Sequence, residues 1–253
     1  MILTSKNNPL IKETASLKER KGRKKLGLFL VEGVKMAKEC QNSALEIERV
    51  FLSESYAKEM GELPFDENKI VVVSDDTFRF LSDEKTPQGV LCRVKIPKEE
   101  LRAPSANALL LDGVSDPGNV GAIIRTANAA GYSEIYLTDG CADPYSPKCV
   151  RASMSGIFFT KLYTGDRTEI LSVLEEETVL SADMSGENAF SFVPPEKFVL
   201  AIGNEANGIS EEVKKFSKKT VKIPMQSTQE SLNAAVSAGI LMYVLKSKTF
   251  LES

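Results

Sequence analysis

The stretch with the clearest chemical character is SDPGNVGAIIRTANAAG, at residues 115–131. It follows the apolar run 108–111, which is typical of a buried parallel strand, and its apolar spacing predicts a helix that Gly131 closes. A glycine-containing turn between a strand and a helix commonly binds phosphate, because the first backbone N–H groups of a helix lack partners within it. The pattern predicts Asn119 as the helix N-cap and places Arg125 on the polar face.

One interpretation of this turn is the dinucleotide fingerprint of a nucleotide-dependent oxidoreductase. A G-x-G-x-x-G motif that ends at Gly121 needs two earlier glycines, and Gly118 supplies the second. The first position holds Asp116, followed by Pro117, so a negative charge would stand where a pyrophosphate must approach. Another ligand is therefore favoured, and the oxidoreductase stays as the weaker alternative.

The composition excludes several reaction types, because the chain contains no histidine. A Ser-His-Asp triad, a Cys-His pair or an HExxH zinc site cannot form, so chemistry must use carboxylates, Arg, Lys, Ser, Asn, backbone amides or a cofactor. The four cysteines form no CxxC pair and have no partners at zinc-ligand spacing. We expect reduced thiols, no metal site and a reactive cofactor.

A second stretch, FVLAIGNEANGIS at residues 198–210, ends an apolar run with polar residues. It places Gly203, Asn204 and Glu205 at the end of a predicted strand, and Gly208 follows in a turn. Polar groups at the end of a buried strand can face a ligand.

A third stretch, KIPMQSTQESLNAAVSAGI, leads from a strand into an apolar helix. Ser227 and Glu230 have the spacing of a capping box, which predicts that the helix begins there. Ser231 and Asn233 would then occupy its first turns, where helix amides and side-chain dipoles can meet a ligand.

Apolar runs and helical patterns alternate in two groups, which predicts two α/β domains. Residues 1–97 form a small α/β domain with a basic N-terminal arm, and the polar, proline-containing segment 98–107 is a linker. Residues 108–253 alternate strands and helices, which implies a mostly parallel sheet covered on both faces. The predicted strands are 26–33, 47–53, 69–75, 89–95, 108–114, 134–139, 158–163, 178–183, 198–203 and 220–224.

The first 25 residues carry eight Lys or Arg and two Glu, although the whole chain has a net charge of −3. The stretch predicts a helix from about Pro9 that Gly22 interrupts. A solvated charged helix is the ordinary interpretation of such a run. The alternative is a phosphate-binding arm, because clustered basic side chains release counterions from nucleic acid.

Taken in order, DGVSDPGNVGAIIRTANAAG, AIGNEANGIS and KIPMQSTQESLNAAVSAGI resemble the motifs of the SpoU/TrmH family of RNA ribose 2′-O-methyltransferases. The likeness covers most of the chain from Leu109 to Gly239. The first hundred residues, with SKNNPLIKETASL and FLVEG, resemble the RNA substrate-binding domain that often precedes the catalytic domain in this family. The resemblance implies a trefoil-knotted α/β methyltransferase domain, S-adenosyl-L-methionine as cofactor and a homodimer.

The resemblance also implies roles for individual residues. Ala206 and Asn207 depart from the Gly-Glu pair often found after the motif's glutamate. We expect Arg125 to anchor phosphate and the developing alkoxide, because a guanidinium stays protonated in proteins. Residues that match cofactor-contacting positions or lie beside them are Gly203, Gly208, Ile223, Met225 and Leu232. Residues that match the polar catalytic set are Asn119, Arg125, Glu205, Ser231 and Asn233. In the arm, the expected RNA contacts are Lys18, Arg20, Lys21, Arg23 and Lys24.

The expected partner is RNA, and the large N-terminal domain favours ribosomal over transfer RNA. A tRNA methyltransferase and a non-catalytic RNA-binding module remain alternatives. No apolar stretch reaches the ~18 residues of a membrane-spanning helix, and MILTSKNNPLIKE lacks the apolar core of a signal peptide. We expect a soluble cytoplasmic protein that makes no contact with a membrane.

Overall fold

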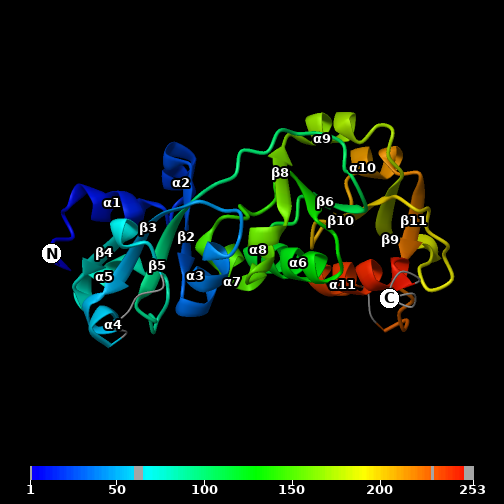
Figure 1. Cartoon of the computed structure of the whole chain (residues 1–253). Coiled ribbons are helices and arrows are strands. Elements are labelled where there is room, and N and C mark those ends of the chain that lie inside the picture. Colours follow the sequence, from blue (N-terminus) through cyan, green and yellow to red (C-terminus); the bar gives the residue numbers. More distant parts are fainter. Residues whose placement is uncertain (1, 60–64, 229–230, 248–253) are drawn as a thin grey trace. The chain divides into compact units, whose positions relative to one another are not determined.

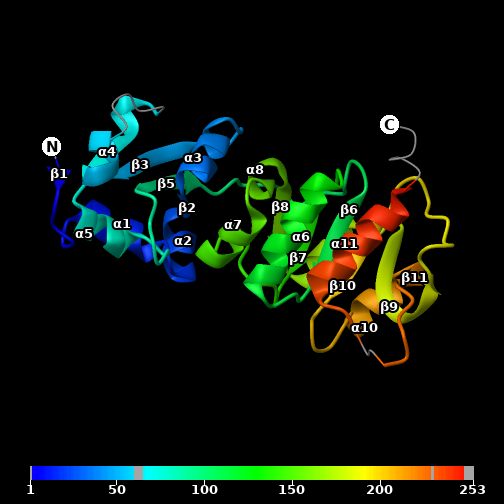
Figure 2. The ribbon, with the colours of Figure 1, turned by 90° about the horizontal axis from the view of Figure 1, so that it is seen from below.

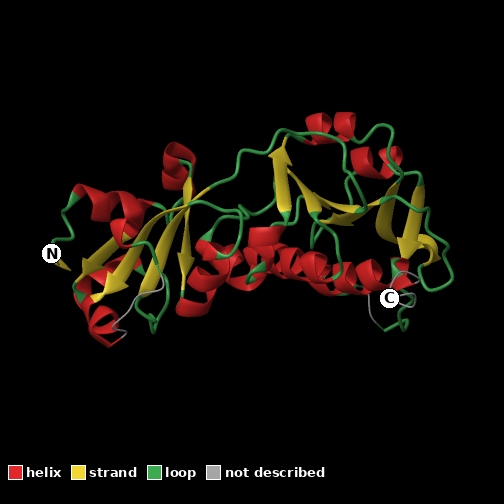
Figure 3. Ribbon diagram, viewed as in Figure 1, coloured by secondary structure: helices red, strands yellow, loops and turns green. Residues whose placement is uncertain are grey.

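A computed structural model describes residues 2–59, 65–228 and 231–247 of the chain (Figures 1 and 3). The chain forms two compact units of mixed helices and strands, which confirms the predicted α/β class. The N-terminal unit comprises Met1–Lys98 and Asp143–Phe158, and the C-terminal unit comprises Glu99–Ala142 and Phe159–Ser253. Within the described residues, no helix combines the length and the apolar character needed to cross a membrane.

The N-terminal unit is built on a five-stranded sheet with the order β1-β4-β3-β5-β2. β5 runs antiparallel to both of its neighbours, whereas β1, β4 and β3 are parallel to one another. The four strands predicted for this part of the chain are confirmed, and the short edge strand β1 is an addition. The strands are β1 (Ile2–Leu3), β2 (Leu28–Glu32), β3 (Ile47–Ser53), β4 (Ile70–Val73) and β5 (Val90–Lys95).

Helices cover both faces of this sheet, as its continuous apolar runs require. α1 and α5 pack on one face, where Ile11 and Phe78 join Phe51 and Leu91 in one core. α3 lies on the opposite face against β2 and β5, with Ala37 fully buried (Figure 2). The helices are α1 (Pro9–Ser16), α2 (Arg20–Leu26), α3 (Val34–Gln41), α4 (Glu54–Glu59) and α5 (Asp75–Leu81), with a 3₁₀ turn at Glu67–Lys69.

The basic arm breaks at a different place from the predicted one. α1 ends at Ser16, and α2 runs through Gly22, which the sequence suggested as the interruption. A Cβ atom at Gly22 would lie 2.0 Å from the carbonyl oxygen of Ser16. The glycine therefore allows α2 to pack closely against the end of α1, and the chain turns before it.

Residues 143–158 pack in the N-terminal unit, although the chain segments before and after them belong to the C-terminal unit. α7 (Pro147–Ser153) contacts β2, and the ring of Tyr145 lies 5.0 Å from that of Phe29. Asp143 accepts hydrogen bonds from Arg23, with Nη2 at 2.6 Å from Oδ2. Local apolar patterns gave no sign of this excursion, because every contact that holds it is distant in sequence.

The C-terminal unit contains a six-stranded sheet with the order β11-β9-β10-β6-β7-β8. All neighbouring strands are parallel, as the alternation of strands and helices predicted. Of the predicted strand 158–163, the first residues form the short helix α8 (Gly156–Phe159), and the strand begins at Lys161. The strands are β6 (Ala108–Asp112), β7 (Glu134–Thr138), β8 (Lys161–Gly165), β9 (Val179–Asn188), β10 (Val199–Gly203) and β11 (Lys219–Lys222).

α9 (Arg167–Val173) and α10 (Glu211–Phe216) cover one face of this sheet, and α6 (Pro117–Ala129) and α11 (Ala234–Leu245) cover the other (Figures 1 and 2). α6 and α11 also pack on each other. β6 and β10 are central neighbours, and Asp112 pairs with Gly203 at their carboxyl ends. The loops that follow these strands therefore meet at one edge of the sheet.

Residues 98–107 contain no helix or strand, but their second half is attached to the C-terminal unit. Glu134, only 1% exposed, accepts hydrogen bonds from the backbone N–H of Ser105 at 2.7 Å and from its hydroxyl at 2.8 Å. Its carboxylate also pairs with Arg102 at 2.8 Å. The chain thus enters β6 from a fixed position.

Candidate active site

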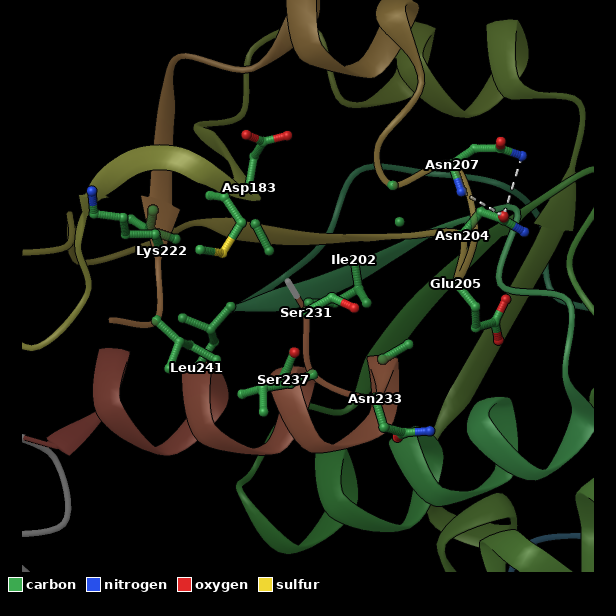
Figure 4. A pocket seen from close by; sticks show the side chains of 18 of the residues that line it. Asp183, Ile202, Asn204, Glu205, Asn207, Lys222, Ser231, Asn233, Ser237 and Leu241 are labelled. Carbon is green, nitrogen blue, oxygen red and sulfur yellow. Dashed lines mark hydrogen bonds between the residues drawn. The ribbon is translucent and has the colours of Figure 1, made fainter. Parts of the chain in front are cut away.

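A cavity of about 630 Å³ opens beside β9, β10 and β11 and the start of α11 (Figure 4). Ile202 and Leu241 form part of its apolar wall, and in Figure 4 they lie between Lys222 on one side and Glu205 and Asn233 on the other. The residues predicted to contact a cofactor all line this cavity: Gly203, Gly208, Ile223, Met225 and Leu232. Of the predicted catalytic set, Glu205, Ser231 and Asn233 line it as well.

The turn after β10 folds back onto the strand and forms one wall of the cavity. Asn204 and Gly208 exchange two backbone hydrogen bonds of 2.9 Å, and Gly208 has a φ of +68°. A Cβ atom at Gly203 would lie 2.2 Å from the carbonyl carbon of Gly208, so only glycine permits this fold. The wall at this point is bare backbone, which a flat ligand can approach closely.

Asn204, which carries no role in the predicted set, holds this turn to the neighbouring loop. Its Nδ2 donates to the carbonyl of Gly113 at 2.8 Å, and its Oδ1 accepts the backbone N–H groups of Ala206 at 3.0 Å and Asn207 at 3.1 Å. The side chain therefore ties the β10 loop to the β6 loop. The available signal was the position of Asn204 within the second motif, between Gly203 and Glu205.

Glu205 is the centre of a hydrogen-bond network that joins the first two sequence motifs. Its Oε2 accepts from the backbone N–H of Ser115 at 3.1 Å and from the Ser115 hydroxyl at 3.0 Å. Its Oε1 accepts from the backbone N–H of Asp116 at 3.2 Å and from Nδ2 of Asn119 at 2.9 Å. Sequence reasoning did not single out Ser115, although it opens the first motif.

These donors set the charge of the Glu205 carboxyl. Burial alone raises its pKa, but hydrogen bonds from the Asn119 side chain and from the backbone N–H groups of Ser115 and Asp116 outweigh burial and hold the pKa at about 2. The carboxylate is therefore ionised at neutral pH and is a very weak base. Glu205 acts as a positioning residue, because its oxygens hold the β6 loop and the amide of Asn119.

Asn119 and Asn233 extend this network to the start of α11. Nδ2 of Asn233 donates to Oδ1 of Asn119 at 2.9 Å, and Oδ1 of Asn233 accepts the backbone N–H groups of Ala235 at 2.9 Å and Val236 at 3.2 Å. The helix amides at one end and the Glu205 carboxylate at the other fix which way each side-chain amide points. Each Nδ2 group keeps a second hydrogen that this chain of bonds does not use.

Two predicted helix caps are wrong, and the same network explains why. Asp116 caps α6 by accepting the Asn119 backbone N–H at 3.0 Å, so the Asn119 side chain is available to bind Glu205. Asn233, not Ser227, caps α11. Glu230, the other half of the predicted capping box, lies outside the described residues.

Arg125 lies on α6, six positions after Asn119, which is ~9 Å along the helix axis. Its side chain is exposed, and within the described part of the chain no hydrogen-bond or ion-pair partner holds it. It does not line the cavity. The guanidinium therefore keeps its five donors for a ligand outside the cavity.

The five predicted RNA-binding residues of the arm differ in their exposure and in their contacts within the protein. Arg23 is 4% exposed, and its guanidinium binds Asp143 and the carbonyls of Leu17 and Lys18. Arg23 is therefore a structural residue, and we remove it from the expected RNA contacts. Lys18 is partly buried and donates to backbone carbonyls. The remaining three are exposed: Arg20, Lys21 and Lys24.

Comparison with known proteins places this geometry in a family. The SpoU rRNA methylase family matches residues 106–243, and the MRM3-like substrate binding domain matches residues 8–92. The chain belongs to the SpoU rRNA methylase family. The family match agrees with the site: all three motifs that build the hydrogen-bond network and the cavity lie inside it.

Individual relatives match over nearly the whole chain. The chain is 30% identical to a Bacillus subtilis 23S rRNA (guanosine(2553)-2′-O)-methyltransferase, over 96% of this chain and 98% of the relative. It resembles an AdoMet-bound rRNA methyltransferase structure from Sinorhizobium meliloti with a TM-score of 0.87 and 25% identity, over 98% of each chain. The AdoMet complex of the Streptomyces viridochromogenes methyltransferase AviRb gives a TM-score of 0.87 and 25% identity, over 96% of this chain and 99% of that one.

Proposed function

We propose that this protein transfers a methyl group from S-adenosyl-L-methionine to a ribose 2′-hydroxyl of RNA, with ribosomal RNA as the favoured substrate. The observation that carries this proposal is the network of Glu205, Asn119 and Asn233 beside a cavity with both apolar and polar walls. The chain is similar along almost its full length to proteins named as rRNA 2′-O-methyltransferases, which supports the same reaction.

The cavity suits this cofactor in size and chemistry. Its volume of about 630 Å³ falls in the range of small-molecule sites. We assign the adenine ring to the wall of Ile223, Met225 and Leu232 and to the backbone at Gly203, which also lines the cavity. When bound, the cofactor supplies a sulfonium methyl group as the electrophile.

The residues of this chain would then orient the nucleotide. Asn119 and Asn233 each keep one amide hydrogen for an oxygen of the ribose or its phosphate. Glu205 holds the Asn119 amide, and Asn119 in turn holds the Asn233 amide. A fixed position of the attacking oxygen replaces an unfavourable encounter and lowers the barrier. Preorganised N–H groups also stabilise negative charge that develops on that oxygen.

We assign phosphate binding to Arg125, because it is exposed, cationic and on the helix that carries Asn119. A protonated guanidinium cannot accept the hydroxyl proton, and Glu205 is a very weak base. The proton therefore leaves to water late in the displacement, after charge has developed next to the amide donors.

The proposal includes a knotted arrangement of the C-terminal segments, a homodimer and a cytoplasmic location. Val236 and Tyr243 are 50% and 43% exposed on α11. They stand seven positions apart, so they share one face of the helix. An apolar face of this kind suits a second copy of the chain, and sedimentation equilibrium of the purified protein tests it.

The decisive experiment combines binding with product mapping. Calorimetric titration should give saturable binding of S-adenosylmethionine and none of NAD. Incubation with the cofactor and ribosomal RNA should then place 2′-O-methyl groups at a discrete nucleotide, and cells without the protein should lack that mark. Cofactor binding without methylation of ribosomal or transfer RNA would favour a non-catalytic RNA-binding module, and NAD binding would favour the oxidoreductase.

A further inference from the structure

Phe80 is an exposed aromatic residue in the N-terminal unit. It belongs to α5, where its neighbours Phe78 and Leu81 are buried in the core, while 38% of Phe80 is accessible to solvent. A single exposed phenyl ring is ordinary on a protein surface, so exposure alone assigns it no role. The groups that surround the ring indicate one.

Two lysine ammonium groups lie over the Phe80 ring. Nζ of Lys18 is 5.7 Å from the ring centroid, and Nζ of Lys6 is 5.8 Å from it. Lys18 is held in place, because its Nζ donates to the carbonyl of Phe80 at 2.7 Å and to that of Ser82 at 3.1 Å. The fold therefore fixes a cation next to an exposed ring before any ligand binds.

The surface beside this aromatic-basic cluster of Lys6, Lys18 and Phe80 is itself basic. Lys18 lies in the turn between α1 and α2, and the exposed basic side chains of α2 follow it. They are Arg20, Lys21, Lys24 and Lys25. A positively charged track next to an aromatic ring is the arrangement that binds single-stranded nucleic acid, because phosphates meet the cations and bases stack on the ring.

We propose that an unpaired base of the RNA substrate displaces the exposed Lys6 ammonium from the Phe80 ring and stacks there, while Lys6 and Lys18 bind the phosphates next to that base. The proposal rests on the proposed function and adds to it a second contact with RNA, formed within the N-terminal unit alone. The base must be unpaired, because bases inside a helix are already stacked on both faces. A ring that only covered the lysine stems could be replaced by any apolar side chain.

Substitution of Phe80 separates these two roles. The probe is a single-stranded oligouridylate with one central 2-aminopurine, whose fluorescence is quenched when it stacks. In the full-length protein, Phe80→Leu should weaken binding about tenfold and abolish the quenching, the scale of one lost base stack. Phe80→Trp should keep both. Salt dependence is measured as the slope of log K against log salt concentration. Lys6→Gln should reduce the magnitude of this slope by ~0.7, the value for one lost phosphate contact with a single strand.

Phe190→Leu is the matched control, because this phenylalanine is 64% exposed in the C-terminal unit; it should bind as the wild type does. Wild-type affinity and quenching in folded Phe80→Leu would overturn the proposal, as would a Phe80→Trp variant as weak as Phe80→Leu. Methyl transfer is measured in parallel over a range of RNA concentrations, where Phe80→Leu should need about tenfold more RNA to reach half of its maximal rate. A protein that binds the probe through Phe80 yet methylates no RNA refutes the proposed function and leaves this site standing.

Discussion

Glu205 offers the sharpest test of how the site works, because a positioning carboxylate and a catalytic base respond differently to the same change. Glu205→Gln keeps the shape and one acceptor oxygen, which can still bind Asn119, while the new NH₂ group can turn toward the Ser115 hydroxyl. Only the backbone N–H of Ser115 then loses its acceptor. Glu205→Ala leaves the Asn119 side chain with only its bond from Asn233, and it removes the acceptor of the Ser115 and Asp116 backbone N–H groups.

The expected magnitudes follow from this geometry. The pKa of Glu205 is lowered from 4.5 to about 2, which at full strength corresponds to ~3 kcal/mol. Glu205 is exposed, so solvent screening reduces this to ~1–2 kcal/mol of folding stability for Glu205→Gln. Methyl transfer should fall by less than ~10-fold in Glu205→Gln and by at least ~100-fold in Glu205→Ala, where Asn119 can shift by an ångström.

The assay is single-turnover methyl transfer with both substrates saturating, together with urea unfolding at several pH values. Because the folded-state pKa lies below the unfolded one, the wild-type advantage over Glu205→Gln should be constant above about pH 5. It should vanish as pH falls through the window between 4.5 and about 2. Glu176→Gln, a change at an exposed glutamate without a described partner, is the control and should alter neither measurement. If Glu205→Gln is as inactive as Glu205→Ala, Glu205 takes part in proton transfer and the positioning role is wrong.

Three further predictions concern other parts of the molecule. Leu232→Glu should abolish calorimetric binding of S-adenosylmethionine, because it places a carboxylate in the apolar wall of the cavity; unchanged affinity in a folded variant would contradict this placement. Arg125→Ala should keep cofactor affinity but lose at least ~100-fold in single-turnover methyl transfer, and Arg125→Lys should be rescued only partly, because lysine lacks the planar fork. A wild-type rate for Arg125→Ala would remove Arg125 from the mechanism. Replacing the exposed cations of α2 by Gln should flatten the salt dependence of RNA binding, and equal salt slopes would identify α2 as a solvated surface. Arg23→Gln, by contrast, should lower the melting temperature, because it removes the donors to the partly buried Asp143 carboxylate and to the carbonyls of Leu17 and Lys18. The exposed cations to be replaced together are Arg20, Lys21, Lys24 and Lys25.

The sequence predicts the strands well, because an apolar run of five or six residues between polar turns is too short for most helices and usually forms a buried strand. It also brings the right motifs to one place, since the carboxyl ends of parallel strands share an edge of the sheet. β6 and β10 demonstrate this: their ends pair at Asp112 and Gly203, and the segments that follow them carry Asn119, at the start of α6, and Glu205.

The parts that the sequence could not predict depend on partners far along the chain. Local rules make Asn119 a good helix cap, yet its side chain donates a hydrogen bond to Glu205, and Asp116 caps the helix instead. Arg23 belongs to a typical basic run, but it pairs with Asp143, 120 positions away, and is buried in that contact. No local pattern predicts such contacts. In both cases the prediction was wrong because a long-range polar contact outweighs a local preference.

The pairing of β6 with β10 also bears on how the protein is made. Asn204 and Gly113, whose contact joins the loops after these strands, are 91 positions apart. At ~5–20 residues per second, a ribosome needs about 5–20 s to deliver β10 after β6. During that interval β6, β7 and β8 can pair with one another, but one side of β6 has no neighbour, and an unpaired strand edge is a template for aggregation. Translation that stalls between residues 138 and 199 would therefore release chains with an open sheet edge, and chaperones should be needed most at this stage of synthesis.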